Sequence, residues 1–498
     1  MATFNSSIFV IFFLPVALLG NLILPARFRN IWLIAVSVGF YGAAQPLALP
    51  LLLLFILVNY YLGRRLEQAH ENPAQARRVL IAGVALNIIP LALLKVCAAY
   101  VVPGLLAGRA LSEAGSPAAL KLWLAWLRTY LTETGTGLPL GISFLVFQVV
   151  AYLVDVYRKR TTSEKNGLAF ATYLAMFPKV TTGPIVLYRD LSRQLHDRLI
   201  SSEGVARGAR RFVVGLGKKV LVADTLGPVA DRIFSLPVSA LSTNLAWLGL
   251  VTYALQIYFD FSGYSDMAIG LAQMFGFQFP ENFNYPYMAR SISEFWRRWH
   301  ITLSSWFRTY VFYPLERQNK RRDPRWQAAN ILTVFFLTGF WHGATPNFVA
   351  WGLMHGIAIA LEQTRFGSWL ANKAWRPIQH SYTLAVLLGT WVLFRSPNLR
   401  LAGEYFKALF GFAQGNNALT SAVMPPIPAY FWLALGLGAI LATTVVSRLA
   451  ETGRAVVNTA PRLALAAAVR DLYLLAIFAI SIAAVVAYNY RPNIYMKF

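Results

Sequence analysis

Two histidines lie in otherwise apolar sequence and are the side chains best suited to acid–base chemistry. His300 lies within Glu294–Arg308, which reads EFWRRWHITLSSWFR, and His342 lies within Phe340–Gly343, which reads FWHG. A neutral imidazole accepts a proton near pH 7, and burying one among lipid-facing segments costs free energy that function usually has to offset. The pair therefore favours an enzyme over a transporter.

The sequence around His300 has the pattern of an amphipathic helix. At 100° per residue, residues 290–313 place polar and aromatic side chains on opposite arcs, with His300 at the boundary. The polar arc holds Glu294, Arg297, Arg298, Ser304, Ser305 and Arg308, and the opposite arc holds Phe295, Trp296, Trp299, Leu303, Trp306, Phe307 and Tyr310. We expect one helix along the membrane interface, with a basic face suited to a negatively charged donor. A simple membrane anchor would explain the same pattern.

The second histidine, His342, is flanked by Gly339 and Gly343, which allow backbone or substrate to approach closely. A core histidine that is hydrogen-bonded to a carbonyl would explain a single such residue. An ionisable group at membrane depth, however, normally faces the interior or a water-filled cavity and serves function. His355 follows later in the chain, and Pro346 is expected to end the helix between the two. His355 ranks third as a candidate, after His342 and His300.

The composition identifies the class of protein. Hydrophobic residues make up 57% of the 498 residues, charged residues make up 13%, and the mean hydropathy is +0.50. Such a chain cannot be solvated as a water-soluble globule, so we predict an all-α, polytopic membrane protein. Apolar stretches long enough to span a bilayer core of about 30 Å include 4–24, 46–62, 79–102, 138–157, 246–275, 345–361, 429–448 and 466–488. With shorter stretches included, we expect about eleven or more membrane segments, some of them re-entrant.

Basic residues predict the orientation of the chain. The net charge is +24, and Arg27, Arg29, the loop 64–78 and the segment 158–165 are expected on the cytoplasmic side. The positive charge is best explained by the membrane topology and by contact with anionic membrane lipids. We therefore do not expect nucleic acid as a partner. Residues 1–24 carry no basic residue before the apolar run, which is the wrong order for a cleavable signal peptide. We predict a multi-pass protein with an external N-terminus.

The chain is expected to form one membrane domain over residues 1–498. N-terminal helices occupy 1–156, a basic catalytic core occupies 157–364, and C-terminal helices occupy 365–498. The single cysteine, Cys97, excludes an intramolecular disulfide and a cysteine-based metal site. The sequence contains no Walker, Rossmann, nucleophile-elbow or HExxH pattern. Catalysis would therefore use histidine directly, with no metal and no tightly bound cofactor.

Other polar residues have structural interpretations. Asp260 and Asp266 lie in apolar sequence, and we expect them to pair with arginines of the 290–313 helix or to orient a histidine. The segment Phe279–Tyr287, FPENFNYPY, is expected to be a loop that holds the start of the next helix. The histidines in polar loops, which are expected to be solvated, are His70, His196 and His380.

Several blocks of the chain resemble one known family. They are Phe177–Ile185, Gln256–Tyr287, Glu294–Leu315, Phe335–Gly356, Trp391–Arg395 and Ile494–Phe498. In this order they resemble the membrane-bound O-acyltransferase (MBOAT) family, in its alginate O-acetyltransferase branch. Two positions depart from the family pattern, since Thr309 stands where an acidic residue is expected and Glu316-Arg317 replaces a glycine pair. These departures bear on the local loop and the partner rather than on the histidines.

The resemblance implies a fold and a reaction. The fold would be a ring of transmembrane and re-entrant helices around a central tunnel, which joins a cytoplasmic acetyl-CoA donor to an acceptor across the bacterial inner membrane. His342 and His300 match the family's main and second histidines. His342 would deprotonate the acceptor hydroxyl as it attacks the thioester, and His300 would hydrogen-bond the acceptor or the thioester carbonyl. Further substrate contacts are predicted at Arg297, Arg298, Lys179, Trp299, Trp341 and Asp260, and the first three are predicted from their charge to hold CoA phosphates.

The implied product is an O-acetylated exopolysaccharide such as alginate, made with a separate periplasmic acyltransferase as partner. Acetylation of cellulose or peptidoglycan, and D-alanyl transfer to teichoic acid, stay open as alternatives. A rival from another class is a transporter or flippase for an anionic glycan or lipid, in which both histidines would be polar residues of a pore. A scaffold subunit would need neither histidine, so the activity of single histidine variants separates these functions.

Overall fold

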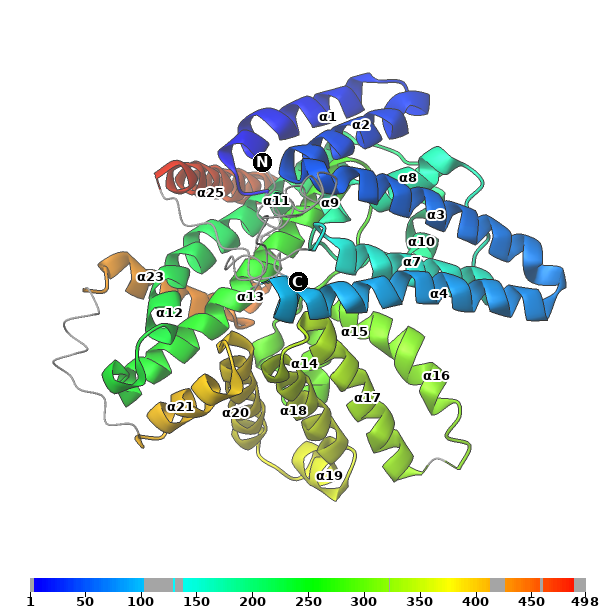
Figure 1. Ribbon diagram of the computed structural model, residues 1–498. Helices are drawn as coiled ribbons and strands as arrows, with labels where there is room; N and C mark the ends of the chain where they lie inside the picture. The colour runs from blue at the N-terminus through cyan, green and yellow to red at the C-terminus, as the bar shows by residue number, and fades with distance from the viewer. Residues whose placement is uncertain are drawn as a thin grey trace, which may run out of the picture. The chain divides into compact units, whose positions relative to one another are not determined.

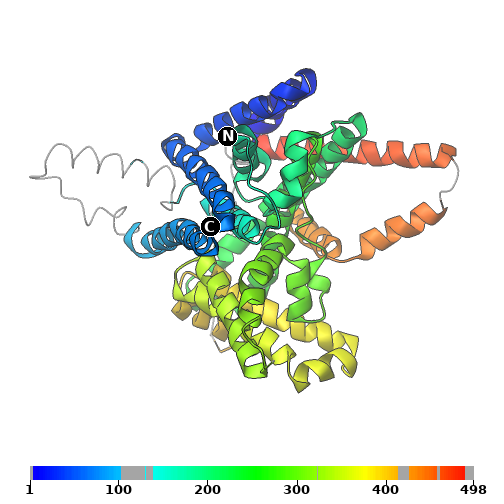
Figure 2. The same cartoon turned by 90° about the vertical axis from the view of Figure 1, so that its right-hand side faces the viewer.

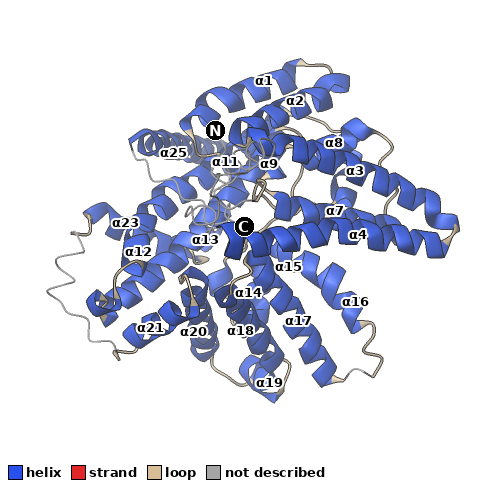
Figure 3. Cartoon of the chain, viewed as in Figure 1, coloured by secondary structure: helices blue, strands red, loops and turns tan. Residues whose placement is uncertain are grey.

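The computed structural model describes residues 4–102, 129, 138–321, 323–412, 426–456 and 460–487, and these form helices without strands (Figures 1 and 3). The prediction of an all-α protein is thereby confirmed. Two compact units divide these residues, one with 4–209 and 268–280 and the other with 210–267 and 281–487. Each unit combines segments that are separated in sequence. The ring around a tunnel and the division of a single domain after residues 156 and 364 stay predictions.

Three helical segments of the described chain are long and apolar enough to cross a membrane. They are Pro46–Glu71, Pro73–Val101 and Leu463–Ala487, and shorter apolar helices lie at Phe9–Ile23, Ile142–Tyr157 and Ala429–Leu441. Large apolar side chains on the long segments, such as Leu54, Ile89 and Leu472, are more than half exposed. Lipid is the solvent that tolerates such surfaces. The chain is an integral membrane protein, as its composition predicts.

The first unit packs its N-terminal helices against one buried helix. Its helices are α1 (Leu14–Ile23), α2 (Ala26–Ala44), α3 (Leu49–Gln68), α4 (Pro73–Val96), α7 (Ile142–Tyr157), α8 (Gly167–Ala175), α9 (Phe177–Val180) and α10 (Tyr188–His196). The helices α3 and α4 form a hairpin, and both pack against α7. Nearly every residue of α7 is buried and most are apolar, which is typical of a helix that protein surrounds on all sides.

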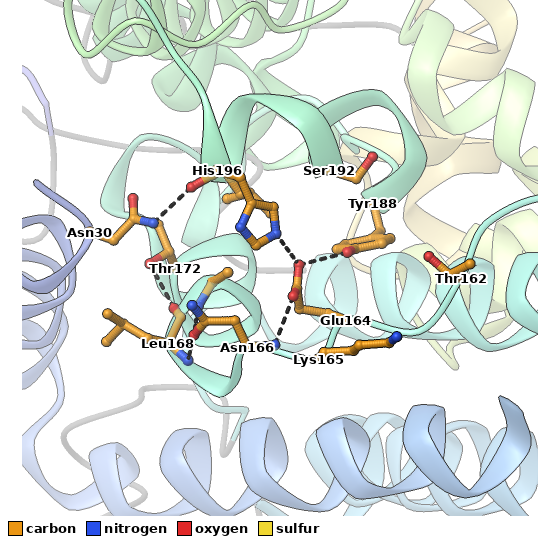
Figure 4. Close-up of polar contacts among 12 residues, drawn as sticks. Asn30, Thr162, Glu164, Lys165, Asn166, Leu168, Thr172, Tyr188, Ser192 and His196 are labelled. Carbon is orange, nitrogen blue, oxygen red and sulfur yellow. Dashed lines mark hydrogen bonds and ion pairs between the residues drawn. The ribbon is translucent and has the colours of Figure 1, made fainter. Parts of the chain in front are cut away.

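A buried carboxylate, Glu164, ties the polar segment after α7 to α10 (Figure 4). Its Oε2 accepts a hydrogen bond from the Tyr188 hydroxyl at 2.7 Å and lies 2.9 Å from His196 Nε2, and its Oε1 accepts from the Asn166 N–H at 2.8 Å. Burial and the neighbouring Glu164 charge raise the pKa of Tyr188, so the phenol stays a donor. The expectation of a loop is wrong at His196, because the residue ends α10, whereas the expectation that it is solvated is confirmed, since its side chain is 52% exposed.

The second unit contains the helices around both candidate histidines. They are the end of α11 (Ser202–Gly217), α12 (Asp224–Phe234), most of α13 (Thr243–Met274), α14 (Ile292–Arg298), α15 (Ile301–Phe307), α16 (Tyr313–Glu316), α17 (Pro324–His342), α18 (Pro346–Glu362), α19 (Arg365–Asn372), α20 (Arg376–Arg395), α21 (Leu399–Leu409), α23 (Ala429–Leu441), α24 (Val445–Val456) and α25 (Ala460–Ala487). Two π-helical turns, Lys218–Ala223 and Arg308–Phe312, continue α11 and α15. Helix α18 packs on both α17 and α20, and these helices stay together in both views (Figures 1 and 2).

Glycines allow α17 and α18 to pack backbone against backbone. A Cβ atom added at Gly339 would lie 2.4 Å from the Phe348 carbonyl oxygen, and one at Gly352 would lie 2.2 Å from the Phe335 carbonyl oxygen. Both distances are far below van der Waals contact, so a side chain at either position would push the helices apart. The close backbone approach that was predicted at Gly339 is confirmed.

The turn between these two helices determines the position of His342. Helix α17 ends at His342, and Gly343 follows with an extended backbone. Pro346 begins α18, where its missing N–H and fixed φ are compatible with a helix start. The predicted break at Pro346 is confirmed. His342 therefore lies at the turn of the hairpin that α17 and α18 form.

The substitution Gly339→Ala is expected to lower the thermal unfolding midpoint, because the added methyl group meets a backbone oxygen that cannot rotate away. Overpacking of this kind costs about 1–3 kcal/mol. Thermal unfolding of the purified protein in detergent measures the change. Gly403→Ala in α21 is the matched control, since nothing lies within 4 Å of a Cβ atom there. Equal midpoints for the two variants would contradict the close contact.

Candidate active site

The chain breaks at His300, between two short helices. Trp299 after α14 is extended, with φ −104° and ψ 130°, and His300 before α15 has φ 41° and ψ 54°. Left-handed backbone is uncommon for a residue that carries a side chain, and it costs free energy. The prediction of one helix over 290–313 is therefore wrong, and the amphipathic pattern applies only within each half.

The side chain of Asn282 explains this break. Its Oδ1 accepts hydrogen bonds from the Thr302 N–H at 3.2 Å and the Thr302 hydroxyl at 2.9 Å, and lies 3.1 Å from His300 Nδ1. Its backbone carbonyl accepts from the Ile301 N–H at 3.0 Å. These bonds satisfy donors that a continuous helix would satisfy internally. The segment Phe279–Tyr287 thus holds the start of the next helix, as predicted.

The hydrogen bonds also determine which nitrogen of His300 carries its proton. The Thr302 N–H can only donate, so the Asn282 atom that it meets is the amide oxygen. That oxygen can only accept, which assigns the proton of His300 to Nδ1 and leaves a lone pair on Nε2. Complete burial lowers the pKa of His300 to about 3, so its ring is neutral near pH 7. His300 is therefore suited to accept a hydrogen bond through Nε2.

Aromatic rings surround His342. Its ring centroid lies 4.6 Å from that of Trp341, 4.7 Å from that of Trp351 and 5.3 Å from that of Phe394, all at steep interplanar angles. The residue is 3% exposed. These three rings form an aromatic cage that encloses the imidazole among aromatic side chains.

The third histidine, His355, also contacts the ring of Trp351. Its Nδ1 accepts a hydrogen bond from Trp296 Nε1–H at 3.3 Å, and its ring centroid lies 5.0 Å from that of Trp351. It also lies parallel to the ring of Phe295, with the centroids 6.1 Å apart. Trp351 contacts His342 and His355, so the two histidines share one aromatic wall. His355 is placed to support that wall.

Two of the predicted substrate contacts are tryptophans, and both are buried. Trp299 is 1% exposed and its ring stacks on Phe295 at 5.5 Å, with Trp391 at 5.2 Å. Trp341 is 5% exposed and contacts the ring of His342. The structure therefore gives each ring a packing role beside a candidate histidine. Their contact with substrate stays a prediction.

The basic residues that were predicted to bind CoA phosphates differ in their surroundings. Arg298 is paired with Glu294 at 2.8 Å. Lys179 belongs to the first unit, is fully buried, donates to Gln148 Oε1 and lies over the ring of Tyr173 at 4.2 Å. Arg297 is exposed and forms no ion pair with any carboxylate in the described part of the chain. Of the three arginine and lysine side chains, Arg297 is the one whose charge stays available to a ligand.

The two aspartates of α13 pair with cations of the preceding segment. Lys219 lies 2.8 Å from Asp260, and both side chains are buried. Asp266 lies 2.8 Å from Arg211 and 2.7 Å from Lys218. Structural pairing is confirmed, but the prediction of arginines from 290–313 as partners is wrong. The partners belong to α11 and the π-helical turn, because this segment packs along α13 through Gly215 and Gly263.

The other two histidines in polar sequence also contact the protein. His380 lies within α20, with its Nδ1 3.2 Å from the Ala289 carbonyl oxygen. His70 lies in a 3-10 turn, with its Nε2 3.1 Å from the Val156 carbonyl oxygen. The expectation of a loop is wrong for His380, which lies within a helix, and both side chains are half-buried, so each is only partly solvated.

A cavity of about 350 Å³ lies beside α17. Its walls come from α14, α15, the following π-helical turn, α17 and α18, and its lining residues are Ser293, Trp296, Arg297, Leu303, Ser304, Phe307, Arg308, Phe312, Gln327, Ile331, Val334, Phe335, Thr338, Ile359 and Gln363. The lining is mainly apolar and aromatic, and it includes two arginines, Arg297 and Arg308. The volume lies within the range of small-molecule sites.

Sequence reasoning missed three residues that shape this region. Arg308 was expected only as part of a polar face, yet it lines the cavity with Arg297. Trp351 contacts both His342 and His355, and Asn282 determines the bend at His300. The only available signals were the Asn-rich loop before the first histidine and a tryptophan between the other two.

Comparison with known proteins gives a consistent set of relatives. Residues 163–372 match the sequence profile of the membrane-bound O-acyltransferase family. A probable alginate O-acetylase of Azotobacter vinelandii is 38% identical over 82% of this chain and 78% of its own length. The corresponding protein of Pseudomonas aeruginosa is 37% identical over 82% of this chain and 75% of its own length. A peptidoglycan O-acetyltransferase of Helicobacter pylori is 33% identical over 82% of this chain and 80% of its own length.

Replacing Asn282 by alanine is expected to destabilise the protein, because the Thr302 N–H and hydroxyl lose their acceptor in a buried site. An unsatisfied buried group of this kind costs about 1–3 kcal/mol. Thermal unfolding in detergent measures the loss. Thr302→Val removes only the hydroxyl and is expected to lower the midpoint less. A midpoint for Asn282→Ala at or above that of Thr302→Val would show that Asn282 does not hold the bend.

Proposed function

This chain belongs to the membrane-bound O-acyltransferase family and is an O-acetyltransferase, and we propose that it acts in the O-acetylation of an exopolysaccharide such as alginate. The donor is cytoplasmic acetyl-CoA, and the acetyl group crosses the bacterial inner membrane. A periplasmic acyltransferase completes the transfer to the polymer. The observation that carries the proposal is the aromatic cage of His342 at one end of α17, with a ligand-sized cavity along the same helix.

The charge of the loops supports entry of the donor from the cytoplasm. The segment before α17 contains Arg317, Lys320 and Arg321, and the first turn of α17 contains Arg325. The helices after α18 begin with further arginines, Arg365 and Arg376. Basic loops face the cytoplasm in bacterial membrane proteins. Gln327 and Gln363 line the cavity near these loops, which favours an opening on the cytoplasmic side.

The direction of α17 supports delivery of the acetyl group to His342. The cavity is lined by α17 from Gln327 to Thr338, one helical turn before His342. At 1.5 Å per residue, Gln327 and His342 are about 22 Å apart along the helix axis. A donor with a long thin arm could keep its charged end at the basic loops while its thioester approaches the cage.

The chemistry assigns one role to each histidine. His342 takes the proton of the acceptor hydroxyl as the oxygen attacks the thioester carbon, and an effect of this kind contributes about 10²–10⁴-fold. The new C–O bond forms as the C–S bond breaks, and the proton passes from His342 to the leaving thiolate. His300 accepts a hydrogen bond from the acceptor through Nε2, because its proton is on Nδ1. No metal takes part in these steps.

Two other functions remain as alternatives, and each predicts a different result. A transporter or flippase would use both histidines as polar residues of a pore, and a scaffold would need neither. The burial of His342 among three aromatic rings favours chemistry over a wide polar pore. Peptidoglycan is the second acceptor to test, since one relative bears that name. Cellulose and D-alanyl transfer to teichoic acid are less supported.

Transfer of labelled acetyl from acetyl-CoA to polymer is the deciding measurement, in membranes that contain the periplasmic partner. His342→Ala is expected to lower the rate about 10²–10⁴-fold, and His300→Ala is expected to lower it as well. His380→Ala, at equal protein level, is the matched control, because His380 lies in α20, its Nδ1 is close to a backbone carbonyl, and it is not among the described lining residues of the cavity. Full activity of His342→Ala would exclude the base assignment and favour the transporter or scaffold.

A further inference from the structure

Two arginines of the first unit lie close together where the start of α2 meets the end of α10. Arg29 lies near the start of α2, and Arg198 lies in the short segment between α10 and α11. Arg198 Nη1 donates a hydrogen bond to Asn30 Oδ1 at 2.6 Å, and Asn30 Nδ2 donates to the Leu195 carbonyl at 2.8 Å (Figure 4). These bonds bring two guanidinium groups from distant parts of the sequence to one place.

The backbone that presents Arg198 is held firmly. Its guanidinium lies over the ring of Phe277, with Cζ 4.5 Å from the ring centroid. Gly276 packs against the same segment with φ 81°, and a Cβ atom added there would lie 3.1 Å from the Leu199 carbonyl oxygen. The segment after α10 is therefore fixed by α2 on one side and by the residues after α13 on the other.

The charges of Arg29 and Arg198 are not compensated within the described part of the chain. Neither guanidinium pairs with a carboxylate there, the adjacent Asp197 included. Arg29 Nε and Arg198 Nε and Nη2 are buried and have no hydrogen-bond acceptor among the described residues. Burial and the neighbouring Arg29 charge lower the pKa of Arg198 to about 10, so the ion persists at pH 7 in an unfavourable setting. An anion that accepts from both groups would offset this cost.

The start of α2 adds to the positive potential. Its first turn contains no acidic residue, although the dipole of a helix favours negative charge at that end. Arg27 and Arg29 lie there instead. Both the helix and the arginines therefore favour a bound anion at this place.

Exposed apolar side chains beside the two arginines indicate the source of the anion. Leu199, which follows Arg198, is 90% exposed, and Ile23 at the end of α1 is 77% exposed. Phe28, which precedes Arg29, is exposed as well. Such side chains insert among lipid acyl chains when basic residues lie at the level of the headgroups. A free phosphate ion would satisfy the arginines and leave the apolar side chains in water.

We propose that Arg29 and Arg198 bind the phosphate of an anionic phospholipid, such as phosphatidylglycerol, while Leu199 and Phe28 contact its acyl chains. The two free oxygens of the phosphodiester accept hydrogen bonds from both guanidinium groups. The ammonium group of a zwitterionic lipid would lie beside two cations, which disfavours that class. The bound lipid connects α2 to the segment after α10, so it stabilises the first unit. This inference does not depend on the transfer reaction.

The thermal unfolding midpoint of the purified full chain in detergent tests the site, during titration with dioctanoyl phosphatidylglycerol. The lipid is expected to raise the wild-type midpoint, and Arg198→Gln and Arg29→Gln are each expected to weaken its apparent affinity about tenfold. Arg77→Gln is the matched control, since Arg77 is an exposed residue of α4 that forms no ion pair with a carboxylate in the described ranges. Dioctanoyl phosphatidylcholine and inorganic phosphate are expected to have little effect.

Arg29→Gln distinguishes a lipid site from a merely structural arginine pair. It leaves the bond between Arg198 and Asn30 in place and removes a like charge, so without lipid its midpoint should equal or exceed that of the wild type. A lower midpoint without lipid, or equal affinity for phosphatidylglycerol in wild type and both variants, would overturn the inference. Equal stabilisation by phosphatidylcholine would show that the arginines do not select the lipid. Equal stabilisation by inorganic phosphate would assign a free anion and overturn the lipid site.

Discussion

The hydrogen bonds of the Asn282 side chain are the interaction on which the candidate active site depends. They end α14, start α15 and hold His300 in left-handed backbone between them. Because of this bend, α14 contributes Trp296 and Arg297 to the cavity while α15 contributes Leu303 and Phe307. A continuous helix would instead place Arg297 on the arc opposite to Trp296, Leu303 and Phe307. The same oxygen that bends the chain also selects the tautomer of His300, so backbone shape and acid–base chemistry have a common origin.

Desolvation explains which charges are paired and which are available. Deep carboxylates such as Asp260 and Glu164 are bonded to nearby cations, hydroxyls or ring nitrogens, because an isolated charge at that depth would be very unfavourable. Arg297 is exposed and lines the cavity beside α17, where water solvates it until a ligand arrives. The contrast distinguishes charges that stabilise the fold from charges that can recognise a substrate. His342 represents a third situation, in which aromatic rings surround a titratable side chain.

Much of the fold could be predicted from the sequence, since composition indicates membrane helices and proline marks the end of α17 near His342. The bend at His300 could not be predicted, because helical periodicity describes only residues that are close together in the chain. The hydrogen bonds that interrupt the helix come from Asn282, which precedes it in a separate loop. Likewise, the charge of Asp260 predicts a cationic partner but not that Lys219 lies nearest. His300 and His342 could be singled out from the sequence because an ionisable side chain is unusual within an apolar stretch. The cavity beside α17 was missed because its lining residues come together only when α14, α15, α17 and α18 pack against one another. The roles of the histidines and of the six further site residues stay predictions.

The left-handed conformation of His300 has a consequence for how substitutions at this position are interpreted. Alanine there removes the imidazole and still has to adopt φ 41°, so its effect combines lost chemistry with backbone strain. Glycine removes the strain but loosens the chain, whereas asparagine adopts this region readily and keeps a polar side chain of similar reach. A series of alanine, glycine and asparagine therefore separates the contribution of a ring nitrogen from that of the fold that presents it. At His342, where the helix ends with ordinary geometry, alanine alone measures the side chain.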